Sequence, residues 1–162
     1  MTVRRLTADD LPAVQRILYL AIGWNDPDDL PPLEIALEHP ALELFHEGWG
    51  RFGDAGCVAE SEGAFVGGAY YRLFTDHRHG DGYIAPDVPE IAVAVDNNYR
   101  GRGVGRRLVN ELAKVARASG IARLSLSVNK PNPARRLYER LGYEIVEDRG
   151  SSVLMVLNLA AD

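Results

Sequence analysis

Hydrophobic residues recur every three to four positions in several parts of the chain, which is the spacing of an amphipathic helix. The clearest stretch covers residues 104–116, and the same spacing predicts helices over residues 10–21 and 33–44. Thr7, just ahead of two aspartates, is the expected N-cap of the first helix. A further helix is predicted to open at Asn132-Pro133, a capping residue followed by a proline in the first turn.

Alternating or continuous apolar runs predict strands around these helices. A turn at Glu62-Gly63 joins two early strands, whereas the later strands alternate with helices, so one mixed sheet with helices on both faces is expected. Residues 75–89 are rich in Gly, Asp and His and predict a loop. The expected strands are residues 3–6, 57–60, 64–74, 90–95, 121–128, 143–146 and 153–159.

Length and composition limit the classes of protein that fit. A chain of 162 residues suits a single domain, which is predicted to span residues 1–162. The composition, with 46% hydrophobic and 25% charged residues, excludes a disordered or collagen-like chain. The single cysteine, Cys57, excludes an intrachain disulfide. No apolar run approaches the length of a membrane span, and the start of the chain lacks a signal-peptide core. A cytoplasmic protein without a membrane partner is therefore expected.

Three glycines interrupt the segment Arg100-Gly101-Arg102-Gly103-Val104-Gly105-Arg106, between the strand at 90–95 and the helix at 104–116. Glycine weakens a helical turn, so three of them in this place need a reason. Backbone N–H groups at a helix N-terminus that are free of bulky side chains can bind a phosphate, and the helix dipole favours the negative charge. The segment predicts a pyrophosphate site, with a simple tight turn as the alternative.

Two other glycine-loop motifs do not fit this segment. A P-loop needs Lys followed by Ser or Thr after its last glycine, whereas Gly105 is followed by Arg106-Arg107. A dinucleotide fingerprint starting at Gly101 would need a third glycine at position 106 and an acid about 20 residues later, near Ser125. Neither is present.

The distribution of charge supports an anionic ligand at the same place. The formal net charge is −5, which argues against a protein that coats nucleic acid. Residues 1–99 carry 6 basic and 17 acidic side chains, whereas residues 100–162 carry 12 basic and 6 acidic ones. The basic side chains therefore begin at the glycine segment, where a polyanionic cofactor would benefit from them.

Two separated motifs resemble the GNAT family of N-acetyltransferases. Arg100-x-x-Gly103-x-Gly105 after a strand is similar to the family's acetyl-CoA signature. The segment from Asn132-Pro133 through Tyr138 to Leu141-Gly142-Tyr143 is similar to its later motif, an Asn-led helix that carries a tyrosine. The resemblance implies a central mixed, mostly antiparallel sheet with helices on both faces and a splayed cofactor cleft. Many members of the family are dimers, so a homodimer is compatible with it.

The resemblance also implies acetyl-CoA as co-substrate. Backbone amides of the glycine segment would hold the pyrophosphate, and the strand that ends at Val95 would pair with the pantetheine arm as an added strand does. A backbone amide near Val93 would stabilise the thioester oxygen. The cofactor-binding residues that the resemblance implies are Val93, Ala94, Val95, Arg100, Gly101, Arg102, Gly103, Val104, Gly105, Arg106, Asn129, Asn132 and Arg135.

The expected reaction is transfer of the acetyl group to a primary amine, by direct attack in a ternary complex. Tyr138 matches the family tyrosine that protonates the departing CoA thiolate, and Glu90 resembles the family's general base in position, with a water chain as the alternative base. A small-molecule acceptor is the first hypothesis. A protein amine, or a non-catalytic acyl-CoA-binding or sensor module, is the alternative.

The acceptor itself has no motif. Acidic and aromatic residues in the segments that relatives use for it suit a cationic amine. Two alternating loop histidines, His77 and His79, lack a further placed ligand, so no metal is expected. The acidic and aromatic candidates are Trp24, Asn25, Asp26, Asp28, Asp29, Trp49, Tyr70, Tyr71, Asp76, His77, His79 and Tyr83.

Overall fold

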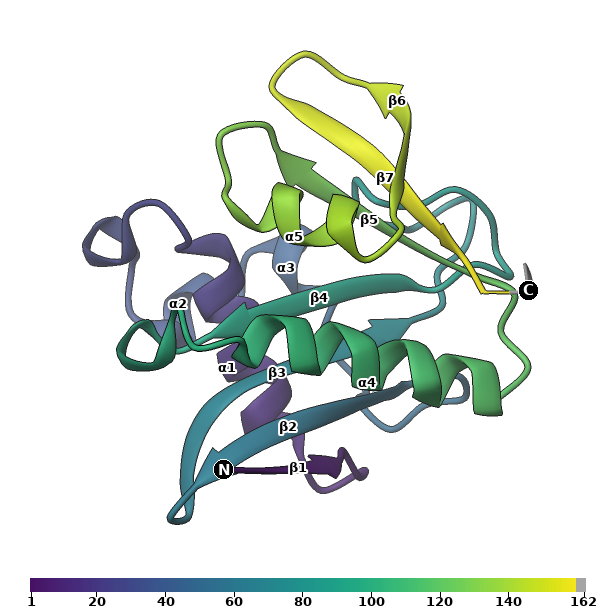
Figure 1. Ribbon diagram of the computed structural model, residues 1–162. Coiled ribbons are helices and arrows are strands. Elements are labelled where there is room, and N and C mark those ends of the chain that lie inside the picture. Colours follow the sequence, from purple (N-terminus) through teal and green to yellow (C-terminus); the bar gives the residue numbers. More distant parts are fainter. Residues whose placement is uncertain (160–162) are drawn as a thin grey trace.

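The computed structural model describes residues 1–159, in which seven strands form one sheet with the order β1-β2-β3-β4-β5-β7-β6 (Figure 1). Its strands are β1 (Thr2–Arg5), β2 (Ala55–Ser61), β3 (Ala64–Arg72), β4 (Glu90–Val95), β5 (Arg123–Asn129), β6 (Glu144–Asp148) and β7 (Ser152–Asn158). Its helices are α1 (Leu11–Ile22), α2 (Leu33–Ala36), α3 (Pro40–Glu43), α4 (Val104–Ala118) and α5 (Ala134–Arg140).

The sheet is mixed, as predicted, and its two parts meet at one weak seam. Strands β1 to β4 are antiparallel neighbours, and so are β5, β7 and β6. Strands β4 and β5 are parallel and pair through the single register Glu90 with Ser125. Beyond that pair the two strands diverge, and residues of both strands line the cleft between them.

Helices cover both faces of the sheet, as the sequence predicts. Helix α4 lies along one face, in front of β2 to β4 in Figure 1, and its apolar stripe joins the larger core cluster. Helix α1 packs on the opposite face of β3 and β4, where Val14 and Ile17 meet Tyr70. Because β4 is held between the two helices, its position at the edge of the cleft is fixed from both sides.

The single helix predicted over residues 33–44 is wrong, because the chain forms two short helices instead. Pro40 begins α3 and lacks the N–H that a continuous helix would use. A proline also disfavours helical geometry in the residue before it, and His39 is accordingly extended, with φ −62° and ψ 130°. The break turns α3 toward the cleft, where it forms part of a wall described below.

The expected capping of the first helix is also wrong. The residue that precedes α1 is Asp10, and it makes no side-chain cap to the helix. Its carboxylate instead accepts hydrogen bonds from Thr7 N at 2.6 Å and from Arg4 Nη1 at 2.9 Å. The ion pair with Arg4 lowers the pKa of Asp10 to about 2. Asp10 therefore ties β1 to the start of α1.

Candidate active site

The divergence of β4 and β5 opens a cavity of about 410 Å³. Residues of both strands line two of its walls, with Ile91, Ala92 and Val93 on β4 and 126–129 on β5. Tyr138 of α5 and Asn132 at the start of that helix complete this side. The opposite wall comes from α1 and from the segment around α3, and consists of Leu18, Ala21, Ile22, Trp24, Ala41, Leu42 and Phe45.

Glu90, the first residue of β4, places a carboxylate in this cavity while its side chain is only 6% exposed. Its Oε2 accepts a hydrogen bond from Gly82 N at 3.1 Å, whereas Oε1 has no hydrogen-bond partner among the described residues. The pKa of Glu90 is raised to about 7, mainly by burial, and the nearby charge of Asp81 acts in the same direction. The backbone of Gly82 and Gly80 and the charge of Arg149 act in the opposite direction. The carboxylate can therefore exchange a proton at neutral pH.

The loop between β3 and β4 approaches Glu90 so closely that only glycine fits there. A Cβ built on Gly80 would lie 2.8 Å from Glu90 Oε2 and 2.3 Å from Cζ of Phe45. A Cβ built on Gly82 would lie 2.8 Å from both Glu90 Oε2 and Ser127 N. The two glycines thus let the main chain pack against the carboxylate and against β5 at the narrow end of the cleft.

Tyr138 lies on α5 on the other side of the cavity and is buried. Its ring centroid is 5.5 Å from that of Tyr143. Burial raises the pKa of Tyr138, so the phenol keeps its proton at neutral pH and can act as a donor. A base and a proton donor consequently line one cavity, from two different elements.

The glycine segment follows β4 and leads into α4. Gly101 has φ +76° and Gly103, the residue that precedes α4, has φ +80°, a left-handed region that favours glycine. A Cβ on either residue would meet nothing within 4 Å, so the main chain here is open to an approaching group. A Cβ on Gly105 would lie 3.3 Å from Leu137 Cδ2 of α5 and 3.7 Å from Val95. The start of α4 therefore borders both β4 and α5.

The residues implied for cofactor binding and catalysis fall in two neighbouring places. Glu90, Val93, Asn129, Asn132 and Tyr138 line the cavity between β4 and β5. The segment from Arg100 to Arg106 lies outside that lining, at the N-terminal end of α4, where the first amides of a helix lack intrahelical partners.

Two of the implied cofactor-binding side chains have other surroundings. Ala94 is buried on the α1 side of the sheet, in the smaller core cluster. Arg135 forms an ion pair with Glu139 at 3.0 Å, one turn further along α5.

Most of the acidic and aromatic residues expected at the acceptor do not gather at the cavity. Trp24 lines it, but Tyr70 and Trp49 pack against each other edge to face and Tyr71 lies in the core cluster on the α4 side. The hydroxyl of Tyr83 hydrogen-bonds Asp76 while its ring stacks on His79. Among residues 1–159 no group of three or more His, Cys, Asp or Glu side chains could hold a metal ion.

The side chains that form the far wall, and the loop that holds Glu90, were not predicted from the sequence. Leu18 and Ala21 fall within the helix predicted over residues 10–21 and carry no signal beyond its spacing, and Phe45 carries no signal at all. The Gly80-Asp81-Gly82 triplet was readable as an unusual loop, and its two glycines could have suggested a close backbone approach.

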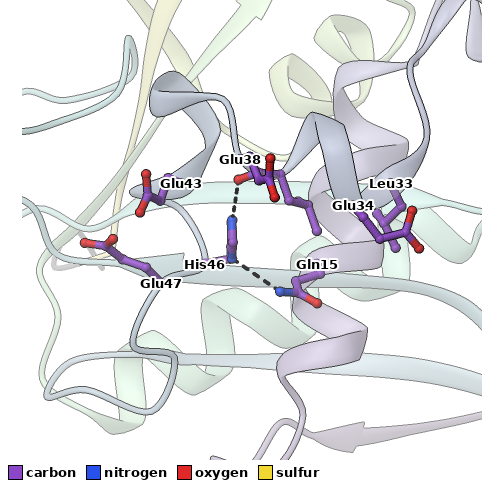
Figure 2. Close-up of a pocket in the computed structure, with 8 residues that line it drawn as sticks. Gln15, Leu33, Glu34, Glu38, Glu43, His46 and Glu47 are labelled. Carbon is purple, nitrogen blue, oxygen red and sulfur yellow. Dashed lines mark hydrogen bonds between the residues drawn. The ribbon is translucent and has the colours of Figure 1, made fainter.

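A second cavity of about 520 Å³ lies on the other side of the α2–α3 segment. Figure 2 shows Glu34, Glu38, Glu43 and Glu47 around His46, which hydrogen-bonds Leu37 O at 3.0 Å and Gln15 Nε2 at 3.4 Å. These hydrogen bonds tie the α2–α3 segment to α1. They therefore support, from behind, the wall of the cavity between β4 and β5. None of the helices within residues 1–159 is long and apolar enough to cross a membrane.

Comparison with known proteins agrees with this geometry. The profile described as "Acetyltransferase (GNAT) family" matches residues 21–143. An acetyltransferase of Pectobacterium atrosepticum is 31% identical over 155 residues, which are 91% of this chain and 90% of that protein. An L-2,4-diaminobutyric acid acetyltransferase of Streptomyces coelicolor is 41% identical over 75 residues, which are 43% of this chain and only 42% of that protein.

A solved structure shows the same fold with a ligand bound. An acetyltransferase from Salmonella typhimurium with its cofactor acetyl-CoA has a TM-score of 0.64 and 24% sequence identity, with 100% of this chain and 95% of that chain covered. The predicted fold class, family and co-substrate are confirmed. This chain belongs to the GNAT family and is an acetyl-CoA-dependent N-acetyltransferase.

Proposed function

We propose that the protein transfers the acetyl group of acetyl-CoA to the primary amine of a small molecule, by direct attack in a ternary complex. One observation carries this proposal. The cavity between β4 and β5 contains a buried carboxylate with a free oxygen, Glu90 Oε1, and a protonated phenol, Tyr138. These are the base and the acid that an acyl transfer from a thioester to an ammonium requires.

The co-substrate fits the surroundings of this cavity. The diphosphate of acetyl-CoA would accept hydrogen bonds from the amides of residues 102–106, which the positive-φ glycines Gly101 and Gly103 leave open. The pantetheine arm would pair with the backbone of Val93 and Val95, along the edge of β4 that is no longer paired with β5 beyond Glu90. Asn129 and Asn132 would contact the arm from β5 and α5.

The chemistry then follows from the position of each group. Glu90 accepts a proton from the acceptor ammonium, and the freed lone pair attacks the thioester carbon. A backbone N–H near Val93 stabilises the negative charge on the thioester oxygen. The new C–N bond forms, the nitrogen loses its second proton to solvent, and the C–S bond breaks as Tyr138 gives its proton to the CoA thiolate. The proton held by Glu90 returns to solvent, and Tyr138 is reprotonated from solvent.

A panel of amines tests the proposal through the release of free thiol from acetyl-CoA. We expect thiol release that depends on both substrates and that falls far more than CoA affinity when Tyr138 becomes Phe. Equal losses of turnover and CoA affinity would assign Tyr138 a packing role only. If acetyl-CoA binds but no small amine is acetylated, the alternatives are a protein amine or a non-catalytic acyl-CoA-binding module. The limited volume of the cavity, about 410 Å³, favours the small molecule.

A further inference from the structure

We infer that the acceptor is a primary amine carried on an apolar body, aromatic or branched aliphatic, without a carboxylate group. The inference rests on the proposed function and deepens it by naming the class of substrate. It follows from the far wall of the cavity, which is the part that the co-substrate does not use.

The far wall is apolar. Leu18, Ala21, Ile22, Trp24, Ala41, Leu42 and Phe45 line this side of the cavity. Such a lining gains free energy by removing apolar substrate surface from water, and its side chains offer no charged partner and only one hydrogen-bond donor, the indole N–H of Trp24. The body of the acceptor is therefore hydrocarbon.

The charges in the cavity are all of one sign. Among the lining residues within 1–159, Asp81 and Glu90 are the only charged ones, and both are acidic. Arg149, the cation next to them, donates to the backbone oxygen of Asp81 and to Glu147 Oε2. An ammonium group gains from both carboxylates, whereas a carboxylate group would be desolvated beside two like charges. The nearby charge of Arg149 reaches Glu90, but that guanidinium is already paired with Glu147.

The wall is also held in place by Arg72, whose guanidinium is engaged behind it and does not turn into the cavity. Arg72 is fully buried and donates to Asp54, to Leu44 O at 3.0 Å and to Glu47 O at 2.7 Å. The hydroxyl of Tyr70 donates to Phe45 O at 3.1 Å. These bonds hold the peptide groups on both sides of Phe45, and they commit the guanidinium of Arg72 entirely.

The unpartnered atom of Glu90 indicates where the amine lies. Oε1 is buried and has no hydrogen-bond partner within the described chain, while Oε2 is occupied by Gly82 N. A buried acceptor atom without a donor is costly unless a ligand supplies one. An ammonium at Oε1 supplies it. The hydrocarbon body of the same molecule then extends along the wall from Phe45, whose ring tip adjoins Gly80 beside the same carboxylate.

Three acceptors with the same ring and the same amine test the inference: 2-phenylethylamine, L-phenylalaninamide and L-phenylalanine. The amide and the acid match in size but differ in charge. At equal concentrations of free amine, we expect kcat/KM for phenylalanine to be roughly 100-fold below that for phenylalaninamide, because of like-charge repulsion without a counter-ion. The kcat/KM for 2-phenylethylamine should equal that for phenylalaninamide.

The possible results separate the inference from the proposed function. If phenylalanine matches or exceeds the amide, the inference is wrong while the proposed function stands. If acetyl-CoA binds but none of the three amines releases thiol, the inference is wrong, and the proposed function is wrong as well only if no amine of the wider panel is acetylated.

Three variants, one of them a control, test which residues cause the effect. Phe45→Ala should lower kcat/KM for 2-phenylethylamine about tenfold, through lost apolar contact, with the KM for acetyl-CoA unchanged. Phe52→Ala, at a ring that is 94% exposed, is the matched control and should change neither value. Asp81→Asn should narrow the difference between the amide and the acid. An unchanged kcat/KM in a folded Phe45→Ala protein would remove the wall from the acceptor site.

Discussion

The two sides of the cleft are built on different principles. The proposed cofactor side is made of main chain from contiguous residues, namely the end of β4, the glycine segment and the start of α4. The proposed acceptor side is made of residues from α1, the segment around α3 and the loop at 80–82, which lie far apart in the sequence. Main-chain recognition of an invariant ligand leaves a motif of glycines, whereas apolar packing around a variable one leaves only ordinary hydrophobic residues.

The strongest test of this comparison is Gly103→Val. The side chain would occupy the open approach to the amides of α4 and would strain a residue with φ +80°. We expect the Kd for acetyl-CoA to rise roughly 1,000-fold, because two or more charge-assisted hydrogen bonds are lost. Isothermal titration calorimetry measures this.

Gly150→Val is the matched control for that variant. Gly150 also has positive φ, +88°, and open space around it, but it lies in the turn between β6 and β7. The Gly150→Val protein should lose about as much stability as the Gly103→Val protein, but it should bind acetyl-CoA with the wild-type Kd. If both variants bind equally well, the glycine segment does not hold the diphosphate.

On the chemical side, Glu90→Gln should lower kcat roughly 100-fold, as expected when a general base is removed. In the wild-type enzyme kcat/KM should rise with pH through about 7, the pKa of Glu90, because only the carboxylate can accept the proton from the amine. The variant should lose this rise. A pH profile that keeps it would favour water as the base.

Glu90 also makes the free energy of unfolding depend on pH, and this can be measured without any substrate. Its pKa is about 7 in the folded protein against 4.5 for the unperturbed group. The protonated side chain therefore favours the fold below pH 4.5, and this contribution is lost as the pH rises through 7. Glu90→Gln should gain about 3 kcal/mol of unfolding free energy over wild type between pH 4.5 and pH 8. Urea unfolding at both pH values checks this, and a constant difference would mean that the carboxyl is not desolvated.

A smaller effect is expected for Tyr138→Phe, roughly 30-fold in kcat, because a thiolate leaves more readily than an alkoxide and needs less help from an acid. Tyr143→Phe is the neighbouring control. The hydroxyl of Tyr143 is buried without a hydrogen-bond partner in the described residues, so its removal should spare activity and raise stability by about 1 kcal/mol. A comparable loss of kcat in both variants would indicate a packing effect.

The smallest predicted effect is a shift in the pH profile of Gly82→Ala. Its Cβ would lie 2.8 Å from both Glu90 Oε2 and Ser127 N, so the loop must move away from β5. The hydrogen bond from Gly82 N, which holds the pKa of the carboxyl down, is then weakened. The rise of kcat/KM should move up by about 0.5 to 1 pH unit. Gly63→Ala, at the tip of the turn between β2 and β3, should leave the profile unchanged.

The sequence predicted the later part of the chain well. Strand β4 occupies the predicted residues, and α5 begins directly after Asn132-Pro133. The residue that precedes α5 is Pro133 and not the expected Asn132, although Asn132 Oδ1 accepts a hydrogen bond from Ala134 N at 3.0 Å. The turn at Glu62-Gly63 is confirmed as well, with φ of 52° and 79°. In each case the signal is local, because periodicity, a cap or a turn involves residues within a few positions of one another.

The sequence could not predict features that depend on distant contacts. The wall residues Leu18 and Phe45 become neighbours of Glu90 only after β3 and β4 pair and Arg72 draws the chain around Leu44 onto the sheet. The acidic segment at 26–29 drew attention because of its composition, yet it lies outside the cavity lining. Charge alone does not reveal which side of the molecule a loop will face.

The single pairing of β4 with β5 has a mechanical consequence. Strands β1 to β4 and strands β5 to β7 are two parts of the sheet that are joined at one register pair. Under the proposed binding mode the pantetheine arm hydrogen-bonds the unpaired edge of β4 and contacts Asn129 of β5. The co-substrate would then act as the missing interior strand. Each catalytic cycle would stiffen the molecule when acetyl-CoA enters and loosen it when CoA departs, so amide hydrogens of β4 should exchange at different rates in the two stages.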